Sequence, residues 1–475
     1  MNGYGSIPHP GLTSDLYHPD SAYVSWRTGR NGQTTFDLYT RANPFGSAYL
    51  LVAGVEQALR FVREFRYTDE ELRFLSQIRD YDPAFLRVLR DLRFTGEILA
   101  MPEGSISFPH EPLMRVTAPF QEAILIESGL LQALSLATLI ATKASRVTWA
   151  AQGRPVAEFS LRRAQEPYTV TRSSFIGGCA STSFLAAAYD FRLRATGTVP
   201  HALIQLYDTE EEAFTAVAET FNRYTLLLDT YDVRRAIVTA CQVAHRYQEK
   251  LGHTLAAVRL DSGDILGDSR FVRQVLDEAG LTEVKILGSG DLDEFKIEQL
   301  LANGAAVDGF GIGTSLGVGA GSVERDVEGG SLGTVYKEVW YQHDFGSGEA
   351  KIKVAGAKST WPGKKEVYRI GRFEEDIIQL ATEPKPANST RLLKPMVSGG
   401  EVLPGSVPPL SEIWEFAQTN LRLLPDVYKQ LVYPPSYPVR FSPGLEALRR
   451  EATQDYLAQP IRRLQAVGGD REPEA

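Results

Sequence analysis

Runs of apolar residues with the length of β-strands alternate with helical patterns between residues 155 and 313, and this alternation constrains the fold more than any other feature. The strand-like runs are PVAEFSLR (155–162), TGTVPHALIQLY (196–207), TLLLD (225–229), TLAAVRL (254–260), VKILGSG (284–290) and VDGFGIG (307–313). Helical patterns occupy residues 181–195, 210–224, 233–252, 269–279 and 292–304. A strand followed at once by its helix, with a repeat of roughly 25–30 residues, is typical of parallel βαβ units. The pattern favours an α/β barrel over a two-half nucleotide fold.

The segments on either side of this region are less regular. Residues 12–110 mix strand patterns (TTFDLYT, FTGEILAMP, SISFP) with an amphipathic pattern at 68–92. After residue 335, strand-like pieces alternate with Pro-rich stretches, and we expect this part to pack back on the N-terminal strands. The expected domains are an N-terminal α+β domain at 1–118, a barrel core at 119–335, and a C-terminal segment at 336–475 with a disordered tail near 468–475.

One apolar segment, AILIESGLLQALSLATLIAT (123–142), has the length of a membrane span. It contains Glu127 and Gln132, however, and it runs on into Lys143 and Arg146. These charges favour a buried helix inside a folded protein, which we expect to begin after Pro119 and to end near Gln152, before Gly153.

Composition excludes several other classes of protein. The chain has 475 residues, of which 43% are hydrophobic, so it can bury a large core. A net charge of −9 argues against a nucleic-acid partner, which requires a basic face. Cys179 and Cys241 are the two cysteines, so a disulfide framework is excluded and a reducing cytoplasm is expected. The N-terminus lacks the basic-then-apolar order of a signal peptide, and no membrane partner is predicted.

In an α/β barrel, the site lies where the strands end at their carboxyl side. The stretch VRLDSGDILGDS (258–269) places Asp261, Asp264 and Asp268 there, around Gly263. Acids this close repel one another unless donors or a cation compensate them. Ribose hydroxyls or magnesium would suit Asp261 and Asp264, and helix capping is the alternative, which we assign to Asp268.

The glycine-rich loop GIGTSLGVGAG (311–321) follows the last strand of the pattern. Its backbone N–H groups, with Thr314 and Ser315, can surround a phosphate, and phosphate sites recur after late strands of barrels. A flexible turn is the alternative. Asp291 and Asp293, after the preceding strand, are better explained as helix caps.

Cationic and imidazole side chains also follow the strands. His201 could be catalytic or structural, and Arg162 and Arg163 could meet an anionic substrate or be a solvated pair. The basic run KVAGAKSTWPGKKEVYR (353–369) could close over a polyphosphate or be a solvated hairpin.

Taken together, these motifs resemble those of the nicotinate phosphoribosyltransferases, a type II phosphoribosyltransferase family. The matching motifs span about residues 12–370 and occur in the family's order: TSDLY, NPFG, EPLMRV, ATKASRV, EFSLRRAQ, GTVPHA, VRLDSGD, SGDLDE, GIGTSL and KSTWPGKKEVYR. The C-terminal hundred residues are much less telling.

The resemblance implies an irregular or incomplete α/β barrel with a second α+β domain formed from both termini. It implies synthesis of nicotinate mononucleotide and pyrophosphate from nicotinate and phosphoribosyl pyrophosphate, in the salvage route to NAD. ATP is implied as a co-substrate, coupled through a phosphohistidine at His201, and Mg²⁺ would accompany the phosphoribosyl donor and ATP. A cytoplasmic homodimer with shared active sites is implied as well.

The resemblance also assigns roles at the site. Tyr17 of a neighbouring subunit and Phe159 would stack on the pyridine ring, and Arg162 would meet the carboxylate or the phosphoribosyl group. Asp261, a catalytic residue together with His201, would hold the ribose hydroxyls. The 5′-phosphate would be held by Gly288, Gly290, Gly313 and Thr314, and the candidates for contacts to pyrophosphate or ATP phosphates are Lys143, Arg146, Lys358 and Lys364. Asp264 is implied as a further binding residue, and no protein side chain is assigned as a metal ligand.

Two positions depart from relatives of this kind. Ala202 stands where the family commonly has Ser after the histidine, which bears on contacts to a phosphohistidine. Nicotinamide-specific relatives carry an aspartate at the position matched to Cys179, so its absence favours nicotinate. The alternatives that stay open are a nicotinamide phosphoribosyltransferase and a non-catalytic barrel that binds a phosphosugar.

Overall fold

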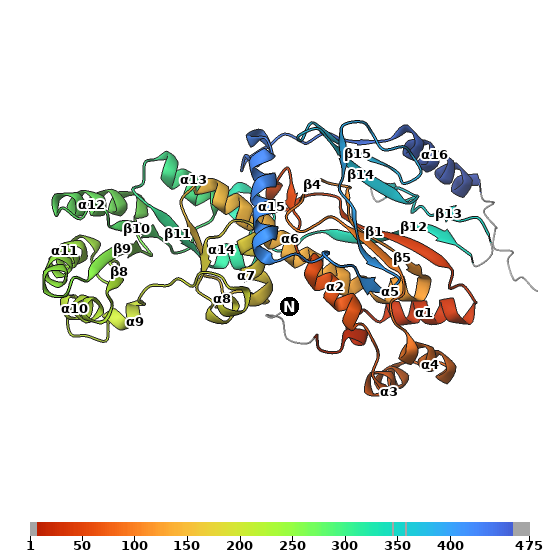
Figure 1. Cartoon of the computed structure of the whole chain (residues 1–475), viewed down its shortest axis with the longest axis horizontal. Coiled ribbons are helices and arrows are strands. Elements are labelled where there is room, and N and C mark those ends of the chain that lie inside the picture. The colour runs from red at the N-terminus through yellow and green to blue at the C-terminus, as the bar shows by residue number, and fades with distance from the viewer. Residues whose placement is uncertain (1–6, 344–345, 357–358, 459–475) are drawn as a thin grey trace, which may run out of the picture.

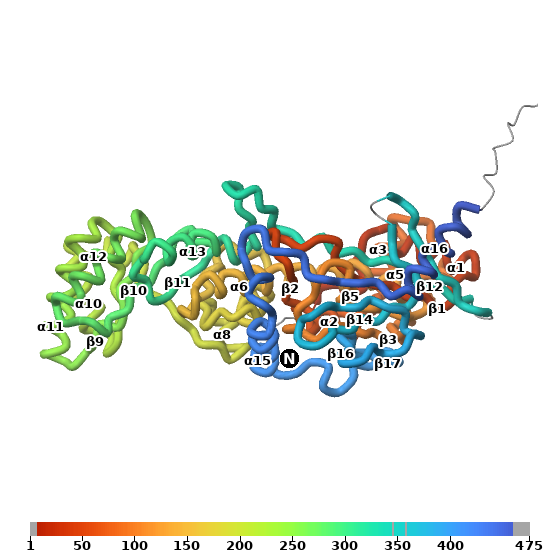
Figure 2. Tube along the Cα trace, turned by 90° about the horizontal axis from the view of Figure 1, so that it is seen from above, coloured from red at the N-terminus to blue at the C-terminus, as the bar shows by residue number. Residues whose placement is uncertain are grey.

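The computed structural model describes residues 7–343, 346–356 and 359–458. The chain forms two lobes, and the long helix α6 (Glu127–Ala150) connects them (Figure 1). Seen from above, the barrel helices α10, α11 and α12 lie at one end of an elongated molecule, and α1 and α16 lie toward the other (Figure 2). No helix within the described residues is long and apolar enough to span a bilayer. The predicted tail near 468–475 lies outside the described residues.

The larger lobe is built on a seven-stranded antiparallel sheet to which both ends of the chain contribute. The strand order is β13-β12-β1-β5-β3-β17-β18. Its strands are β1 (Gln33–Thr40), β3 (Glu97–Ala100), β5 (Pro112–Pro119), β12 (Thr334–Gln342), β13 (Glu349–Ala350), β17 (Lys394–Ser398) and β18 (Glu401–Val402). Because β12 pairs with β1 and β17 pairs with β3, the second α+β domain is made from N- and C-terminal segments, as predicted.

Helices and smaller sheets complete this lobe. A four-stranded sheet has the order β16-β14-β15-β19, and β2 pairs with β4. These strands are β2 (Leu50–Leu51), β4 (Ile106–Ser107), β14 (Lys365–Ile370), β15 (Glu375–Leu380), β16 (Ser389–Arg391) and β19 (Val439–Phe441). The helices are α1 (Tyr17–Arg27), α2 (Val55–Glu64), α3 (Asp69–Ile78), α4 (Pro83–Asp91), α5 (Phe120–Leu125), α15 (Leu410–Leu423) and α16 (Pro443–Ala458), with short 3₁₀ turns at Pro10–Leu12, Pro44–Gly46, Val323–Arg325 and Asp426–Lys429.

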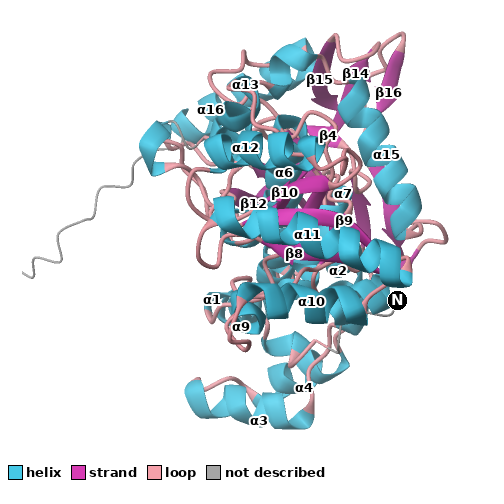
Figure 3. Cartoon of the chain, turned by 90° about the vertical axis from the view of Figure 1, so that its left-hand side faces the viewer, coloured by secondary structure: helices cyan, strands magenta, loops and turns pink. Residues whose placement is uncertain are grey.

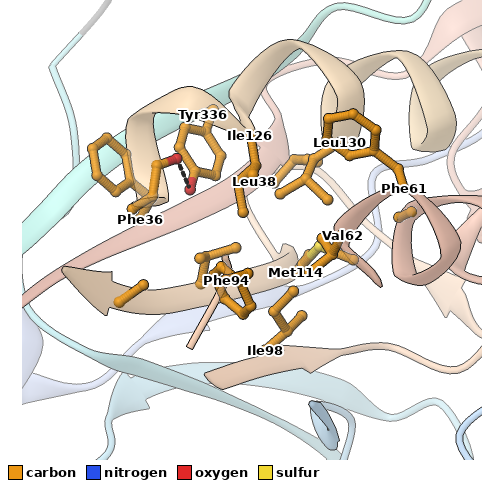
Figure 4. Packing of buried hydrophobic residues seen from close by; sticks show 14 of the residues in the cluster. Phe36, Leu38, Phe61, Val62, Phe94, Ile98, Met114, Ile126, Leu130 and Tyr336 are labelled. Carbon is orange, nitrogen blue, oxygen red and sulfur yellow. Dashed lines mark hydrogen bonds between the residues drawn. The ribbon is translucent and has the colours of Figure 1, made fainter. Parts of the chain in front are cut away.

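One hydrophobic cluster holds the large sheet against the helices (Figure 4). Phe36 and Tyr336, from paired strands, stack with ring centroids 4.5 Å apart. The Tyr336 hydroxyl donates a hydrogen bond to the backbone carbonyl of Ala123 (3.0 Å), so this buried phenol is satisfied. Leu130 of α6 belongs to the same cluster, which anchors the start of the connecting helix in the larger lobe.

The apolar segment at 123–142 is buried inside the protein, as predicted, but it is divided between two helices. Helix α5 ends at Leu125 and α6 begins at Glu127. Helix α6 ends at Ala150, and Gly153 follows with φ of +82°, a conformation that favours glycine.

The smaller lobe is an incomplete barrel of six parallel strands in the order β7-β6-β11-β10-β9-β8. They are β6 (Val156–Glu158), β7 (Ser181–Thr182), β8 (Arg223–Leu227), β9 (Thr254–Leu260), β10 (Lys285–Gly288) and β11 (Gly309–Ile312). Helices α10, α11 and α12 lie outside the strands β8, β9 and β10 (Figure 3). The barrel helices are α7 (Pro167–Ile176), α8 (Leu185–Phe191), α9 (His201–Ile204), α10 (Glu210–Thr220), α11 (Val233–Leu251), α12 (Ile265–Glu278), α13 (Glu294–Ala302) and α14 (Thr314–Gly317).

Two predictions within the barrel are wrong. The segment 181–195 is not helical throughout, because Ser181 and Thr182 pair with β6 before α8 begins at Leu185. The segment 196–207 is not a strand, because its residues His201–Ile204 form the short helix α9. The extended Pro200 directly precedes this helix. Proline disfavours continued sheet pairing and is well suited to a helix start.

Candidate functional site

Asp261 is the centre of the polar cluster at the carboxyl ends of the barrel strands. It follows β9, and its Oδ1 accepts hydrogen bonds from Ser289 Oγ (2.6 Å) and from the guanidinium of Arg259. Its Oδ2 lies 3.7 Å from His201 Nε2. Burial by itself raises the pKa of Asp261, but the Ser289 hydrogen bond, Arg259 and His201 outweigh burial and hold it below the usual value. Asp261 is therefore a carboxylate at neutral pH.

His201 is the first residue of α9 and reaches toward Asp261 from outside the sheet. Its Nδ1 lies 3.1 Å from Thr230 Oγ1, just after β8. The His201 side chain is 40% exposed, so a ligand at the rim can contact the ring directly. Thr230 fixes one ring nitrogen, which leaves Nε2 directed to the space beside Asp261.

Asp229 is a site residue that the sequence analysis missed. Its Oδ2 accepts from the backbone N–H of Asp261 (3.2 Å) and from Ser262 Oγ (2.5 Å), so it fixes the turn after β9. Its Oδ1 is buried without a hydrogen-bond partner among the described residues. The sequence did contain a signal for Asp229, because it ends the run TLLLD at the same edge of the sheet.

Two acids after Asp261, Asp264 and Asp293, are helix caps. Asp264 is the N-cap of α12, and its Oδ1 accepts from the backbone N–H of Gly267 (3.1 Å). The assignment of the cap to Asp268 is thus wrong, because α12 begins four residues earlier than the expected start at Ser269. Asp293 caps α13 and accepts from the N–H of Lys296 (2.8 Å), in line with the capping interpretation.

Glycines allow these loops to approach one another closely. A Cβ on Gly290 would lie 1.6 Å from the backbone oxygen of Asp261, and its φ of +80° also favours glycine. A Cβ on Gly311 would lie 2.4 Å from the Phe159 ring, so the absence of a side chain makes room for that ring. Gly288 is the last residue of β10 and pairs with Phe310 of β11.

The predicted phosphate loop leaves the same edge of the sheet as the Asp261 turn. Gly313 precedes the short helix α14, which begins at Thr314. Strand β11 pairs with β10, and β10 pairs with β9, all in parallel. Two strand spacings amount to about 10 Å, so one sugar phosphate can span the distance between the two loops.

A cavity of about 340 Å³ lies inside the curved sheet below this edge. Phe159, Gly288, Ser289 and Arg259 are among its lining residues, so one predicted pyridine residue and one predicted phosphate residue border the same space. Gly290, Gly313 and Thr314 do not line it. Arg162 is exposed in the loop after β6.

Tyr17 is far from this cavity in the chain's own fold, because it begins α1 in the larger lobe. Its side chain is 52% exposed, and its hydroxyl lies 3.5 Å from Glu127 Oε1. Partial burial, Glu127 and Asp15 raise the pKa of Tyr17 to about 12. Tyr17 lines a separate cavity of about 510 Å³.

Lys143 and Arg146 are paired within the protein. Lys143 Nζ lies 2.5 Å from Glu294 Oε2 and donates to the backbone oxygen of Ala320 (2.6 Å). Arg146 donates to Glu294 Oε1 (3.2 Å) and to the backbone oxygen of Leu431 (3.1 Å). All three charged side chains are at most 1% exposed. In this conformation they join α6 to α13, and both cations already face a carboxylate.

The described residues of the basic run, 353–356 and 359–369, belong to the larger lobe. Lys364 Nζ lies 3.7 Å from the centre of the Trp340 ring, and burial together with Arg115 lowers its pKa. Lys365 is buried and pairs with Asp37 (2.8 Å). Lys358 lies outside the described residues.

Cys179 does not face the site. It is 2% exposed and belongs to the same core cluster as Val156 and Val170. The neighbouring Ala180 and Ser181 line the cavity and Cys179 does not, so the preference for nicotinate inferred from Cys179 stays a prediction.

Comparisons with known proteins identify the family. Residues 12–135 match the nicotinate phosphoribosyltransferase (NAPRTase) N-terminal domain, and residues 385–449 match the nicotinate phosphoribosyltransferase C-terminal domain. A nicotinate phosphoribosyltransferase of Bacillus subtilis is 36% identical, over 91% of this chain and 92% of its own length. One from Mycobacterium tuberculosis is 35% identical over 91% of both chains. The chain belongs to the nicotinate phosphoribosyltransferase family.

The fold of this nicotinate phosphoribosyltransferase family member agrees with a solved relative. A crystal structure of human nicotinic acid phosphoribosyltransferase matches with a TM-score of 0.81 and 30% identity, covering 93% of this chain and 100% of the human one. The sequence motifs carried the resemblance to about residue 370, and the C-terminal domain match extends it to residue 449.

Proposed function

We propose that this chain transfers a phosphoribosyl group from phosphoribosyl pyrophosphate to nicotinate, forming nicotinate mononucleotide and pyrophosphate in NAD salvage. ATP hydrolysis drives the reaction through transient phosphorylation of His201. The observation that carries the proposal is the approach of His201 Nε2 to Asp261 Oδ2 (3.7 Å), on the same sheet edge as the glycine-rich loop. A phosphoryl acceptor, a sugar-binding acid and a phosphate loop then share one rim.

In the transfer step, the pyridine nitrogen of nicotinate forms a bond to ribose C1 while the bond from C1 to pyrophosphate breaks. Positive charge develops on the sugar, and the bonding electrons leave with pyrophosphate. Asp261 is held ionised by Arg259 and Ser289 and can accept hydrogen bonds from the ribose hydroxyls as that charge grows. Fixing Asp261 in advance avoids reorganisation at the moment of reaction.

Magnesium enters with the polyphosphates. No group of three or more His, Cys, Asp or Glu side chains within the described ranges could hold a metal ion. Mg²⁺ is commonly bound by substrate phosphates and waters, with few protein ligands. It would neutralise the leaving pyrophosphate while the protein positions the sugar.

In the coupling step, His201 Nε2 attacks the terminal phosphoryl group of ATP, an N–P bond forms, and ADP leaves. The attacking nitrogen needs its lone pair, so the proton must reside on Nδ1, where it can be donated to Thr230 Oγ1. Nε2 is then the free nitrogen on the exposed side of the ring.

The active unit in this proposal is a homodimer. Tyr17 is half exposed and lies in the other lobe, so a second subunit would have to supply it to stack against Phe159. The free, buried thiols of Cys179 and Cys241 suit a cytoplasmic protein.

The test is an assay with phosphoribosyl pyrophosphate and Mg²⁺, with and without ATP, comparing nicotinate with nicotinamide. We expect nicotinate mononucleotide, faster with ATP, and [γ-³²P]ATP should label the wild type. The variant His201→Ala should lose the label and the ATP stimulation but keep a slow ATP-independent rate. A higher kcat/KM for nicotinamide would favour the nicotinamide enzyme, and binding without turnover or label would favour a non-catalytic barrel.

A further inference from the structure

The interior of the barrel is open in a way that ordinary α/β barrels are not. Barrel interiors are normally filled by bulky branched side chains. Here the positions that line the cavity of about 340 Å³ include Ala157, Thr225, Ala257 and Gly311. Because these side chains are small or absent, the cavity extends from the catalytic rim along the strands.

The cavity ends away from the rim in cationic side chains. Arg223 and Lys285 are the first residues of β8 and β10, and both line the cavity. Arg194 lines it from the segment beside β7, where Ala195 forms a parallel bridge with Thr182. Strands of a parallel barrel begin on the face opposite the catalytic rim, so Arg223 and Lys285 mark a second mouth, while Arg194 lines the passage beside the end of β7.

The spacing to the rim follows from the chain. Thr198 and Ser289 both hydrogen-bond to Arg259, which holds Asp261. Lys285 precedes Ser289 by four residues, and Arg223 pairs with Thr254, which precedes Asp261 by seven residues. Four residues of extended chain cover about 13 Å, so Lys285 and Arg223 stand well below the reacting centre.

Two of these cations have no partner for their charge. Arg194 and Arg223 are exposed, and neither guanidinium has a hydrogen bond or ion pair within the described ranges. Lys285 Nζ lies 3.6 Å from Asp308 Oδ1 at an exposed site, and no carboxylate side chain lines the cavity. In a chain of net charge −9, this is a local positive field at the end of a passage.

We propose that this mouth is the entrance for the carboxylate-bearing pyridine substrate, with Arg194 and Arg223 attracting its negative charge. The proposal rests on the proposed function. Phosphoribosyl pyrophosphate occupies the opposite rim, between Asp261 and the glycine-rich loop, and would cover that end of the cavity. The pyridine then reaches the sugar through the barrel, and Phe159 lies in its path at the inner end. Charge at an entrance raises the local concentration of an opposite charge, more strongly at low salt.

The test compares Arg194→Gln, Arg223→Gln and the double variant with Arg235→Gln, which removes an exposed cation from the outer helix α11. Rates are measured against nicotinate at several NaCl concentrations, with saturating phosphoribosyl pyrophosphate, ATP and Mg²⁺. In the double variant we expect KM for nicotinate to rise about ten-fold, kcat to stay within two-fold, and kcat/KM to lose most of its salt dependence. Arg235→Gln should match the wild type.

An unchanged KM for nicotinate in the double variant would refute the entrance, and so would an equal rise in Arg235→Gln. A rise confined to the KM of phosphoribosyl pyrophosphate would refute it too, because the arginines would then serve a phosphate. A wild-type enzyme that makes no nicotinate mononucleotide would instead refute the proposed function.

Discussion

Two clusters of opposite charges in this molecule have similar compositions and opposite surroundings. At the lobe junction, Glu294 meets Lys143 and Arg146 with all three side chains at most 1% exposed. At the barrel rim, Asp261 meets Arg259 and His201 with side chains 17–40% exposed. The first cluster has all its cations committed to one carboxylate, and the second leaves a ring nitrogen open to a ligand.

The difference shows why charged residue types alone do not locate a site. A buried charge must be matched, so removing one member of a buried group is costly. A half-exposed charged group is partly solvated, so its protein partners can fix its orientation and still leave some of its hydrogen-bonding capacity for a ligand. The lobe junction is therefore expected to control folding, and the rim to control chemistry.

The largest effect should follow from Glu294→Gln, which leaves Lys143 and Arg146 buried without a counter-charge. We expect it to lower the free energy of unfolding by about 3–5 kcal/mol, measured by urea titration. Glu298→Gln is the matched control, because Glu298 is exposed on the same helix and should stay within about 0.5 kcal/mol. Wild-type stability with weakened pyrophosphate binding would instead make the two cations phosphate ligands.

The next effect should come from Gly290→Ala at the rim. The added Cβ would meet the backbone oxygen of Asp261 at 1.6 Å, so the turn that carries the carboxylate must move. Misplacement of a catalytic group by about 1 Å costs roughly 100-fold in rate, and we expect kcat to fall by about that factor.

Gly280→Ala separates contact from backbone strain. Gly280 has φ of +74°, close to that of Gly290, but a Cβ there meets nothing within 4 Å. It should lower the melting temperature slightly and leave kcat unchanged. Equal losses of kcat in both variants would show that strain, not displacement of Asp261, explains the result.

A smaller effect should distinguish Asp261 from Asp264. In Asp261→Asn the negative charge facing the ribose is lost, and we expect KM for phosphoribosyl pyrophosphate to rise about ten-fold. In Asp264→Asn the helix cap is kept, because Asn caps about as well as Asp, and KM should change less than two-fold. Steady-state kinetics at saturating nicotinate provide the comparison, and the reverse order would place the ribose at Asp264.

The sequence predicted what depends on pattern along the chain. The β9 run TLAAVRL matches the observed strand Thr254–Leu260, and the rule that sites lie at carboxyl strand ends brought Asp261 and the 311–321 loop to one edge. The two loops lie at the same edge of one sheet because the parallel strands β9, β10 and β11 all end at that edge.

What the sequence could not show depends on which distant groups meet. Nothing near Lys143 in the chain indicates that Glu294 will neutralise it, because the two are 151 residues apart. Nothing in the sequence around Cys179 indicates that its side chain is buried in the core. Asp264 and Asp268 are the same residue type and are equally suited to cap a helix. Asp264 is the cap because α12 starts directly after it, at Ile265.

The smallest expected effect is a dependence of stability on pH at the rim. The pKa of Asp261 in the folded protein is below its usual value, so ionised Asp261 contributes stability above the unfolded-state value of about 3.9. That contribution should be lost as the pH falls through the folded-state pKa, below about 4. The free-energy difference between the wild type and Asp261→Asn, from urea titrations between about pH 7 and pH 3, should therefore be flat near neutrality and should fall at the acid end. A difference that grows on acidification would mean that the rim destabilises the ionised carboxyl, which Arg259 and Ser289 would then not be holding in the charged form.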